Sequence, residues 1–349
     1  MILPRLKYDG KPELVLNGLQ LRMKEQIEQK IDRGIYNFEE VDCPVCDSIQ
    51  REPIGEKDRY GLFFPTNICT HCGLVYTSPR MNQDSYNQFY NDEYRKLYVG
   101  TDQPTKAFFE KQRRKGKRIY TFLAENNLIQ SSSFSVLEVG CGAGGIIDFF
   151  REKGATVKGL DLGEEYIMYG REVHGLDLEV GTLSDIEVTA KPDLIIYSHI
   201  LEHILDVRDE IEQIKKCARE DTILYVEVPG IKEIHQNYGM NILKYFQNAH
   251  TYHFTLESLK NLMGVNGFEL IHGNQFVQSA FRKATQEIKA HSDYHATIEF
   301  IKKTEKNRPY YSFTKRALTN RMNQAAVKFM EVTRTRTFAK KLKSSFSRR

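Results

Sequence analysis

A glycine-rich segment near the middle of the chain has the residue types and spacing of a cofactor-binding turn. The mainly apolar residues 136–139 lead directly into four glycines within residues 140–145, and a helical apolar pattern follows. This order predicts a strand, a tight turn and a helix N-terminus, where the backbone can closely approach a nucleotide-like cofactor. Two motifs overlap in this turn. One is G-x-G-x-x-G, formed by Gly140, Gly142 and Gly145, and the other is E-x-G-x-G-x-G, formed by Glu138, Gly140, Gly142 and Gly144.

Four cysteines upstream have the spacing of a metal site. Cys43 and Cys46 form one C-x-x-C pair, Cys69 and Cys72 form a second, and 22 residues separate the two pairs. A tetrahedral Zn²⁺ takes four thiolates in this arrangement, and such a site is structural because protein ligands fill every position. His71 is interpreted as a spacer that faces solvent. A disulfide framework is the alternative, but no signal peptide opens the chain and two other cysteines would stay unpaired.

Four segments downstream of the glycine turn are predicted to continue the same fold. Residues 156–161 form a strand that ends in Asp161, where a carboxylate can accept both ribose hydroxyls of an adenosine cofactor. Residues 181–186 follow, then a strand with a Leu-Glu-His turn at 192–203, and a further strand at 224–229. Together with the second glycine motif, these segments resemble the class I S-adenosylmethionine (SAM)-dependent methyltransferases.

The resemblance implies an α/β fold with a doubly wound, mostly parallel seven-stranded sheet of the Rossmann-like type. A small zinc-ribbon-like module and helical arms would be added at the N-terminus. In this family the acidic residue of the glycine motif helps to place the methionine end of SAM, and Asp185 would face the adenine amino group. The cofactor-site residues that the resemblance implies are Glu138, Gly140, Cys141, Gly142, Gly144, Asp161, Leu162, Asp185, Ile186, Ser198 and His199.

Hydride transfer is the alternative chemistry for a glycine turn of this kind. A short-chain dehydrogenase would carry Tyr-x-x-x-Lys after its fourth strand. The only such spacing in this chain joins Tyr311 to Lys315, far downstream in a basic segment. The sequence therefore favours methyl transfer over a nicotinamide-dependent reaction.

The region after the second cysteine pair extends the resemblance. Residues 72–80 and 89–94 look like the N-terminal zinc segment of a bacterial methyltransferase group, and the similarity covers about residues 40–275. Members of that group commonly act in the biosynthesis of surface sugars and other glycans. The resemblance therefore implies a sugar or glycan as the methyl acceptor.

The loop at residues 245–255 contains the candidate general base, since methylation of a hydroxyl requires removal of its proton. His250 takes the position of a histidine that does the proton work in related sugar C-methyltransferases. Those enzymes have Tyr-His-Glu-His where this chain has Gln-Asn-Ala-His, so methylation of oxygen or nitrogen fits better than methylation of carbon. His199 and Glu227 are further catalytic candidates. The alternatives are that His250 braces the helix predicted at 256–263 and that Glu227 points into a helix layer.

The chain is expected to contain five segments. Helical spacing covers residues 12–38, and the last strand of the sheet is predicted near 296–301. The segments are an N-terminal helical arm (1–40), a zinc-binding module (41–80), a helical connector that covers the cofactor pocket (81–130), the SAM-binding domain (131–304) and a basic amphipathic tail (305–349).

Positive charge is concentrated near the C-terminus. Residues 302–349 contain 15 Lys or Arg against two acids, a net of +13, so the total of +4 leaves −9 for residues 1–301. Phe338, Leu342 and Phe346 recur every four residues among cations, a pattern suited to an anionic membrane surface. Nucleic acid is the less favoured partner because the body is acidic, and a solvated tail is the third interpretation. Without an apolar run near the ~20 residues of a membrane span, we expect a cytoplasmic enzyme, peripheral at the inner membrane if its tail binds lipid.

Three functions are compatible with these patterns. The first is a SAM-dependent methyltransferase that acts on an oxygen or nitrogen of a sugar, nucleotide-sugar or glycan in polysaccharide biosynthesis. The second is an RNA methyltransferase that grips its substrate with the zinc module and the tail, although an aromatic and basic single-strand platform is missing. The third is a binding scaffold with an inactive SAM fold, which the presence of Glu138, Asp161 and Asp185 argues against. The sequence makes no prediction of the oligomeric state.

Overall fold

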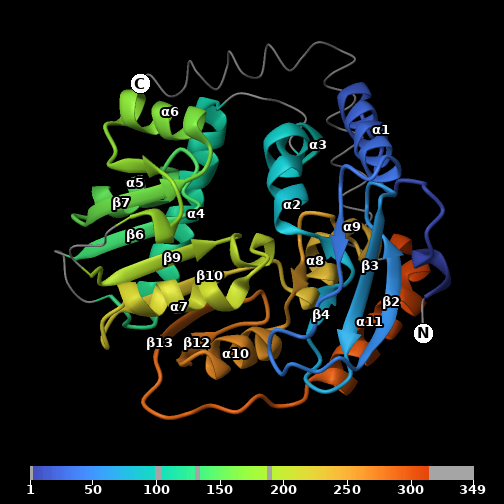
Figure 1. Ribbon diagram of the computed structural model, residues 1–349. Helices are drawn as coiled ribbons and strands as arrows, with labels where there is room; N and C mark the ends of the chain where they lie inside the picture. The colour runs from blue at the N-terminus through green and yellow to red at the C-terminus, as the bar shows by residue number, and fades with distance from the viewer. Residues whose placement is uncertain (1–2, 99–103, 130–133, 187–190, 314–349) are drawn as a thin grey trace.

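A computed structural model describes residues 3–98, 104–129, 134–186 and 191–313. The amphipathic pattern of the basic tail lies outside these residues. Two sheets stand side by side in the molecule, one built from the middle and the end of the described chain and the other mainly from its N-terminal part (Figure 1).

The larger sheet has seven strands within the described residues, in the order β12-β13-β10-β9-β6-β7-β8. Strands β6 to β10 are mutually parallel, and β13 runs antiparallel between β10 and β12. This arrangement confirms the predicted doubly wound, mostly parallel sheet. The strands are β6 (Ser135–Val139), β7 (Thr156–Asp161), β8 (Leu178–Val180), β9 (Leu194–Ser198), β10 (Ile223–Glu227), β12 (Phe268–Gly273) and β13 (Gln278–Lys283).

Alternating apolar side chains bury both faces of this sheet. In β9, for example, Ile195 and Tyr197 belong to one hydrophobic cluster, whereas Leu194 and Ile196 belong to another. Successive side chains of a strand point to opposite faces, so a strand with apolar residues at every position requires helices on both sides. The first cluster includes side chains of α7 (Val207–Cys217) and α10 (Leu256–Val265), and the second those of α4 (Lys106–Glu125), α5 (Gly145–Glu152) and α6 (Glu164–His174).

The smaller sheet is antiparallel and has the order β11-β4-β3-β2. Three of its strands come from the N-terminal region, whereas β11 comes from the loop that follows β10. This loop therefore joins the two sheets. The strands are β2 (Arg51–Lys57), β3 (Phe63–Cys69), β4 (Val75–Thr77) and β11 (Tyr252–His253), and a separate pair consists of β1 (Phe38–Glu39) and β5 (Arg80–Met81).

Helices α2 (Gln83–Phe89) and α3 (Arg95–Tyr98) lie between the two sheets, and α1 (Gly18–Asp32) lies at one end of the smaller sheet (Figure 1). The arm helix α1 begins after Asn17, whose side chain forms a capping box with Gln20, and it ends at Asp32. It is therefore shorter than the helical pattern at 12–38. The remaining helical elements are a π-helical turn (Tyr90–Tyr94), α8 (Ile234–Asn237), α9 (Ile242–Tyr245) and α11 (Tyr294–Asn307).

The prediction of a last strand at 296–301 is wrong, because these residues lie within helix α11. The buried residues of α11 are Thr297, Ile298, Ile301 and Thr304, a spacing of three to four that matches one face of a helix. The sheet instead ends with the hairpin of β12 and β13. The helix predicted at 256–263 is confirmed as α10, and Thr255 caps it by accepting a hydrogen bond from the backbone N–H of Ser258.

A search of the helices in the described residues finds none that is both long enough and apolar enough to cross a membrane.

Candidate active site

The glycine turn links β6 to α5 and has a backbone that only glycine accommodates well. Gly140, Gly142 and Gly144 have φ values of 71°, 56° and 77°, in the left-handed region. A Cβ atom on Gly140 would lie 1.9 Å from the side chain of Ile200. The turn therefore leads directly into the N-terminus of α5, where residues 141–145 are buried and the N–H of Gly145 donates to the side-chain oxygen of Gln112 at 3.4 Å.

Asp161 lies beside this turn at the carboxyl end of β7. Its carboxylate accepts hydrogen bonds from the backbone N–H of Gly142 at 2.8 Å and from that of Gly163 at 2.7 Å. A guanidinium nitrogen of Arg95 is 3.6 Å away. The structure thus brings the predicted ribose-binding carboxylate and the glycine turn together, and α3 supplies a cation that sequence spacing did not indicate.

Replacing Asp161 with Ala is expected to weaken SAM binding roughly 10- to 100-fold, because hydrogen bonds to a charged group contribute about 1.5–3 kcal/mol. Isothermal titration calorimetry with SAM measures the change. Asp177→Ala is the matched control. This exposed carboxylate immediately precedes β8 and so lies at the amino ends of the parallel strands, whereas Asp161 lies at their carboxyl ends. Equal affinities of the Asp161 variant and the control would contradict the assignment of Asp161.

Glu138 is the second acidic residue of the predicted SAM site, and it is 1% exposed. One of its carboxylate oxygens, Oε2, has no hydrogen-bond partner among the described residues. Burial raises the pKa of Glu138 well above its usual range, and the positive charge of Lys115 opposes this shift. A buried acceptor without a partner next to the glycine turn fits the cationic methionine end of SAM, which could satisfy it.

Helix α4 packs against the glycine turn and against α5. The Gln112 side chain donates a hydrogen bond to the carbonyl of Cys141 at 2.9 Å. Gly116 permits close packing, since a Cβ atom there would lie 2.5 Å from the carbonyl oxygen of Ile146 in α5. Helix α4 of the predicted connector thus packs on the turn, and its role as a cover of the bound cofactor remains a prediction. Cys141 itself is fully buried, and its contact with the cofactor is likewise a prediction.

The other residues with predicted cofactor roles lie at the carboxyl edge of the sheet. Asp185 accepts hydrogen bonds from the backbone N–H and the hydroxyl of Thr182, both at 2.7 Å, and these bonds lower its pKa. Leu162 is 69% exposed after β7. Ser198, at the end of β9, donates a hydrogen bond to Glu227 at 3.4 Å. The cofactor contacts of these residues and of Ile186 remain predictions.

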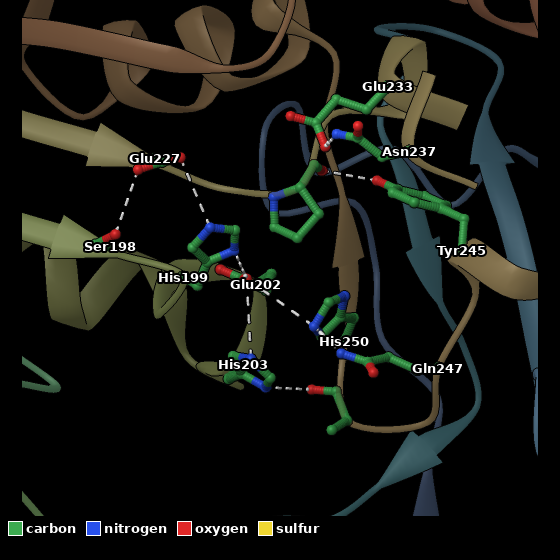
Figure 2. A network of polar contacts seen from close by, with 12 residues as sticks. Ser198, His199, Glu202, His203, Glu227, Glu233, Asn237, Tyr245, Gln247 and His250 are labelled. Carbon is green, nitrogen blue, oxygen red and sulfur yellow. Dashed lines mark hydrogen bonds and ion pairs between the residues drawn. The ribbon is translucent and has the colours of Figure 1, made fainter. Parts of the chain in front are cut away.

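His199 follows β9 and lies between two carboxylates. Its Nδ1 atom is 3.5 Å from Glu202 Oε1, and its Nε2 atom is 3.8 Å from Glu227 Oε1 (Figure 2). Its backbone has a φ of 62°, unusual for a residue with a side chain, and its N–H donates to the carbonyl of Glu227 at 2.7 Å. Burial lowers the pKa of His199, but the two carboxylates outweigh this effect, so the net shift is upward.

Glu227 is an anion held in place by several cations. It pairs with Arg118 from α4 in addition to His199. Burial alone would raise the pKa of Glu227, but the hydrogen bond and charge of His199, together with Lys115 and Arg118, lower it to about 2. Glu227 therefore contacts both His199 and a residue of helix α4, and its catalytic role remains a prediction.

Glu202 forms the centre of the histidine cluster, although sequence reasoning assigned it no function. It is 1% exposed, and within the described residues neither of its carboxylate oxygens accepts a hydrogen bond. Its Oε1 atom lies 3.5 Å from His199, 3.8 Å from His203 and 3.9 Å from His250 (Figure 2). The one sequence feature that could have pointed to Glu202 is its place in the Leu-Glu-His turn.

His250 lies on the far side of Glu202 from His199. Its ring is nearly buried and contacts the side chain of Gln247. Burial lowers the pKa of His250 well below its usual range, and the neighbouring His203 adds to the effect. The structure thus brings the three predicted catalytic residues, His250, His199 and Glu227, into one network through Glu202.

The four cysteines of the two C-x-x-C pairs converge in the N-terminal module. The Sγ atoms of Cys43 and Cys72 are 3.4 Å apart, those of Cys46 and Cys69 are 3.5 Å apart, and all four lie within 4.8 Å of one another. All four are free thiols. Four sulfurs this close can bind one tetrahedral Zn²⁺ with bonds of about 2.3 Å.

Residues 103–273 match the model of the family described as "Methyltransferase domain". With the doubly wound sheet and the glycine turn, this match shows that this part of the chain contains a SAM-dependent methyltransferase domain. SAM is accordingly its cofactor.

Individual relatives cover only parts of the chain. An uncharacterized methyltransferase of Staphylococcus carnosus is 24% identical over 166 residues, which make up 43% of this chain and 79% of that protein. A ubiquinone biosynthesis O-methyltransferase of Vibrio parahaemolyticus is 37% identical over 93 residues, 24% of this chain and 37% of that enzyme. The chain therefore spans less than half the length of the Vibrio enzyme. Among solved structures, a SAM-dependent methyltransferase of Clostridium acetobutylicum has a TM-score of 0.40 and 14% identity, covering 57% of this chain and 99% of that one.

Proposed function

We propose that this enzyme transfers the methyl group of SAM to an oxygen of a sugar, nucleotide-sugar or glycan, with nitrogen as the second choice of acceptor atom. The observation that carries the proposal is the histidine–carboxylate network at the carboxyl edge of the sheet. Ligands of doubly wound folds bind at this edge, so the network lies where an acceptor hydroxyl must lose its proton.

The choice of oxygen has a second support. The Vibrio relative is named as an O-methyltransferase. The choice of a sugar depends on the similarity of the cysteine module and the His250 loop to bacterial methyltransferases that act on glycans.

In the proposed reaction SAM supplies an activated methyl group, and the residues of the chain position the acceptor and move its proton. The side chain of His199 is 37% exposed and that of His250 is 8% exposed, so His199 is the ring that an acceptor can reach. Glu227 and Glu202 orient this ring and stabilise its protonated form. His250 would support Glu202 from behind, and its use as the direct base is the second option for the same network.

The assignment of His199 predicts a shift of the pH profile. A base works only when deprotonated, so turnover should rise with pH through the raised pKa of His199. Glu227→Gln removes a negative charge that stabilises the imidazolium, so this rise should move to lower pH. The measurement is the rate of S-adenosylhomocysteine formation against pH, and the control is Glu210→Gln on α7, which contacts Tyr197. An unshifted profile in the Glu227 variant would contradict the assignment.

We also propose that Cys43, Cys46, Cys69 and Cys72 bind one structural Zn²⁺. The support is the convergence of four free sulfurs at distances that match a tetrahedral site. With all ligand positions filled by protein, the ion would stabilise the module and leave no position for a catalytic water.

The acceptor class can be tested by measuring S-adenosylhomocysteine release with nucleotide-sugars, bacterial glycans and RNA in parallel. We expect release with a carbohydrate acceptor only. Release with RNA alone would instead support the RNA methyltransferase alternative. No release in any mixture, despite SAM binding, would support a scaffold with an inactive fold.

A further inference from the structure

The carboxylate of Glu202 is buried among three histidine rings. A buried ionised carboxylate needs hydrogen bonds or a close counter-charge, and an unpaired one costs several kcal/mol. Within the described residues both of its oxygens lack a hydrogen bond. The imidazole nitrogens around Glu202 Oε1 are 3.5–3.9 Å away, too far for hydrogen bonds but close enough to share one bound cation with it.

Two of these imidazoles present metal-ligand nitrogens to the carboxylate. The Nδ1 atom of His203 is 2.9 Å from the carbonyl of Ala249 and 2.5 Å from the hydroxyl of Tyr90. In the tautomer in which Nδ1 donates to the carbonyl, Nε2 keeps its lone pair on the side of Glu202. Metal-binding histidines are commonly oriented in this way by a carbonyl on the other nitrogen. The Nε2 atom of His250 contacts the amide nitrogen of Gln247, a donor, so Nε2 is unprotonated and accepts this hydrogen bond. A metal ion would take this lone pair in place of the Gln247 hydrogen bond.

The ligand atoms of Glu202, His203 and His250 all lie within 4.8 Å of one another. They come from two segments, the turn after β9 and the loop before β11, which a backbone hydrogen bond joins between the N–H of Thr251 and the carbonyl of Glu202 at 2.9 Å. The fold therefore assembles this cluster and holds it in register (Figure 2).

We propose that Glu202, His203 and His250 bind a divalent first-row transition-metal ion, separate from the four-cysteine site. Two imidazoles and one carboxylate suit Zn²⁺, Fe²⁺, Co²⁺ or Mn²⁺, whereas Mg²⁺ and Ca²⁺ prefer oxygen ligands. Three protein ligands leave open coordination positions, and His199 is the next donor toward the exposed side. Resting on the proposed function, the role of the ion is to bind the acceptor oxygen and lower the pKa of its hydroxyl next to His199.

The test uses the full-length protein with its four-cysteine site already loaded with Zn²⁺, and Co²⁺ as the spectroscopic probe, in the absence of SAM and acceptor. We expect one equivalent of Co²⁺ with weak visible bands and without the intense thiolate charge-transfer bands of a cysteine site. Glu202→Gln and His250→Gln should each weaken Co²⁺ binding more than about 100-fold, since even outer-shell changes cost 10- to 100-fold.

His253→Gln is the matched control. It follows the same loop and is buried, and among the described residues neither of its ring nitrogens has a hydrogen-bond partner; it is not part of the ligand set. It should bind Co²⁺ like the wild type. Circular dichroism of each variant shows whether it folds. If Glu202→Gln or His250→Gln does not fold, His203→Gln is measured in its place.

Wild-type protein that binds no Co²⁺ beyond the cysteine site, or folded ligand variants that bind it as tightly as the control, would overturn the proposal. Because binding is measured without methyl donor or acceptor, this result is independent of whether the enzyme methylates a sugar.

Discussion

Replacing both Cys69 and Cys72 with Ser is expected to remove the zinc ion, destabilise the N-terminal module and abolish most of the turnover. Apparent binding free energies of structural zinc in small modules are about 10–16 kcal/mol, so its loss is a large change for a domain of ordinary stability. Zinc content by elemental analysis, the melting temperature and the rate of methyl transfer should all fall together.

The expected loss of turnover follows from the smaller sheet, to which both the cysteine module and the loop after His250 contribute strands. Strand β11, next to His250, pairs with β4 of the cysteine module, and the N–H of Thr77 donates to the carbonyl of Thr251 at 2.9 Å. Disruption of the module therefore removes the strand that holds β11, and with it one support of the loop that carries His250.

Cys217→Ser is the control for this variant, because Cys217 ends α7 and lies outside the sulfur cluster. It should keep zinc, stability and turnover. A wild-type protein without zinc, or a double variant that retains it, would show that the four sulfurs are not a metal site.

His199→Asn is expected to lower kcat by roughly 10²- to 10⁴-fold, the usual contribution of a positioned general base. Asn is the appropriate replacement because residue 199 has a φ of 62°, a conformation that Asn tolerates better than most side chains. The variant thus removes the base with little backbone strain. SAM affinity should stay within about twofold, because the glycine turn and Asp161 are unchanged.

Rapid-quench measurement of the methyl-transfer step, with SAM affinity measured separately, checks this prediction. His295→Asn is the control, since His295 is exposed on α11 and far from the network in sequence. A variant with normal kcat but weakened SAM binding would make His199 a cofactor ligand, the other role predicted for it. If both kcat and SAM affinity are normal, His199 is not the base and His250 becomes the candidate.

The β6–α5 turn and the strand order could be predicted from the sequence because their signals are local. Glycines that need a left-handed backbone, apolar runs that need cover on both faces and an acidic residue at the end of β7 all lie within short segments. The cysteine cluster was likewise predictable, because the spacing of each pair limits the geometry of its two sulfurs.

Contacts between distant segments could not be predicted in the same way. Arg95, Gln112 and Arg118 reach the site from helices that precede the sheet, and their positions depend on packing that leaves no motif. The pairing of β11 with β4 is equally non-local. The false strand at 296–301 has a related cause, since a short apolar run does not distinguish a strand from one buried face of a helix.

The most direct test of the central claim is to incubate the enzyme with SAM labelled with ¹³C in its methyl group and a mixture of nucleotide-sugars, and to examine the carbohydrate products by NMR. We predict a new ¹³C signal with the chemical shift of a methyl ether on a sugar, absent when the His199→Asn variant is used. Label on a sugar carbon, label only on added RNA, or S-adenosylhomocysteine formation without any labelled carbohydrate would contradict the account.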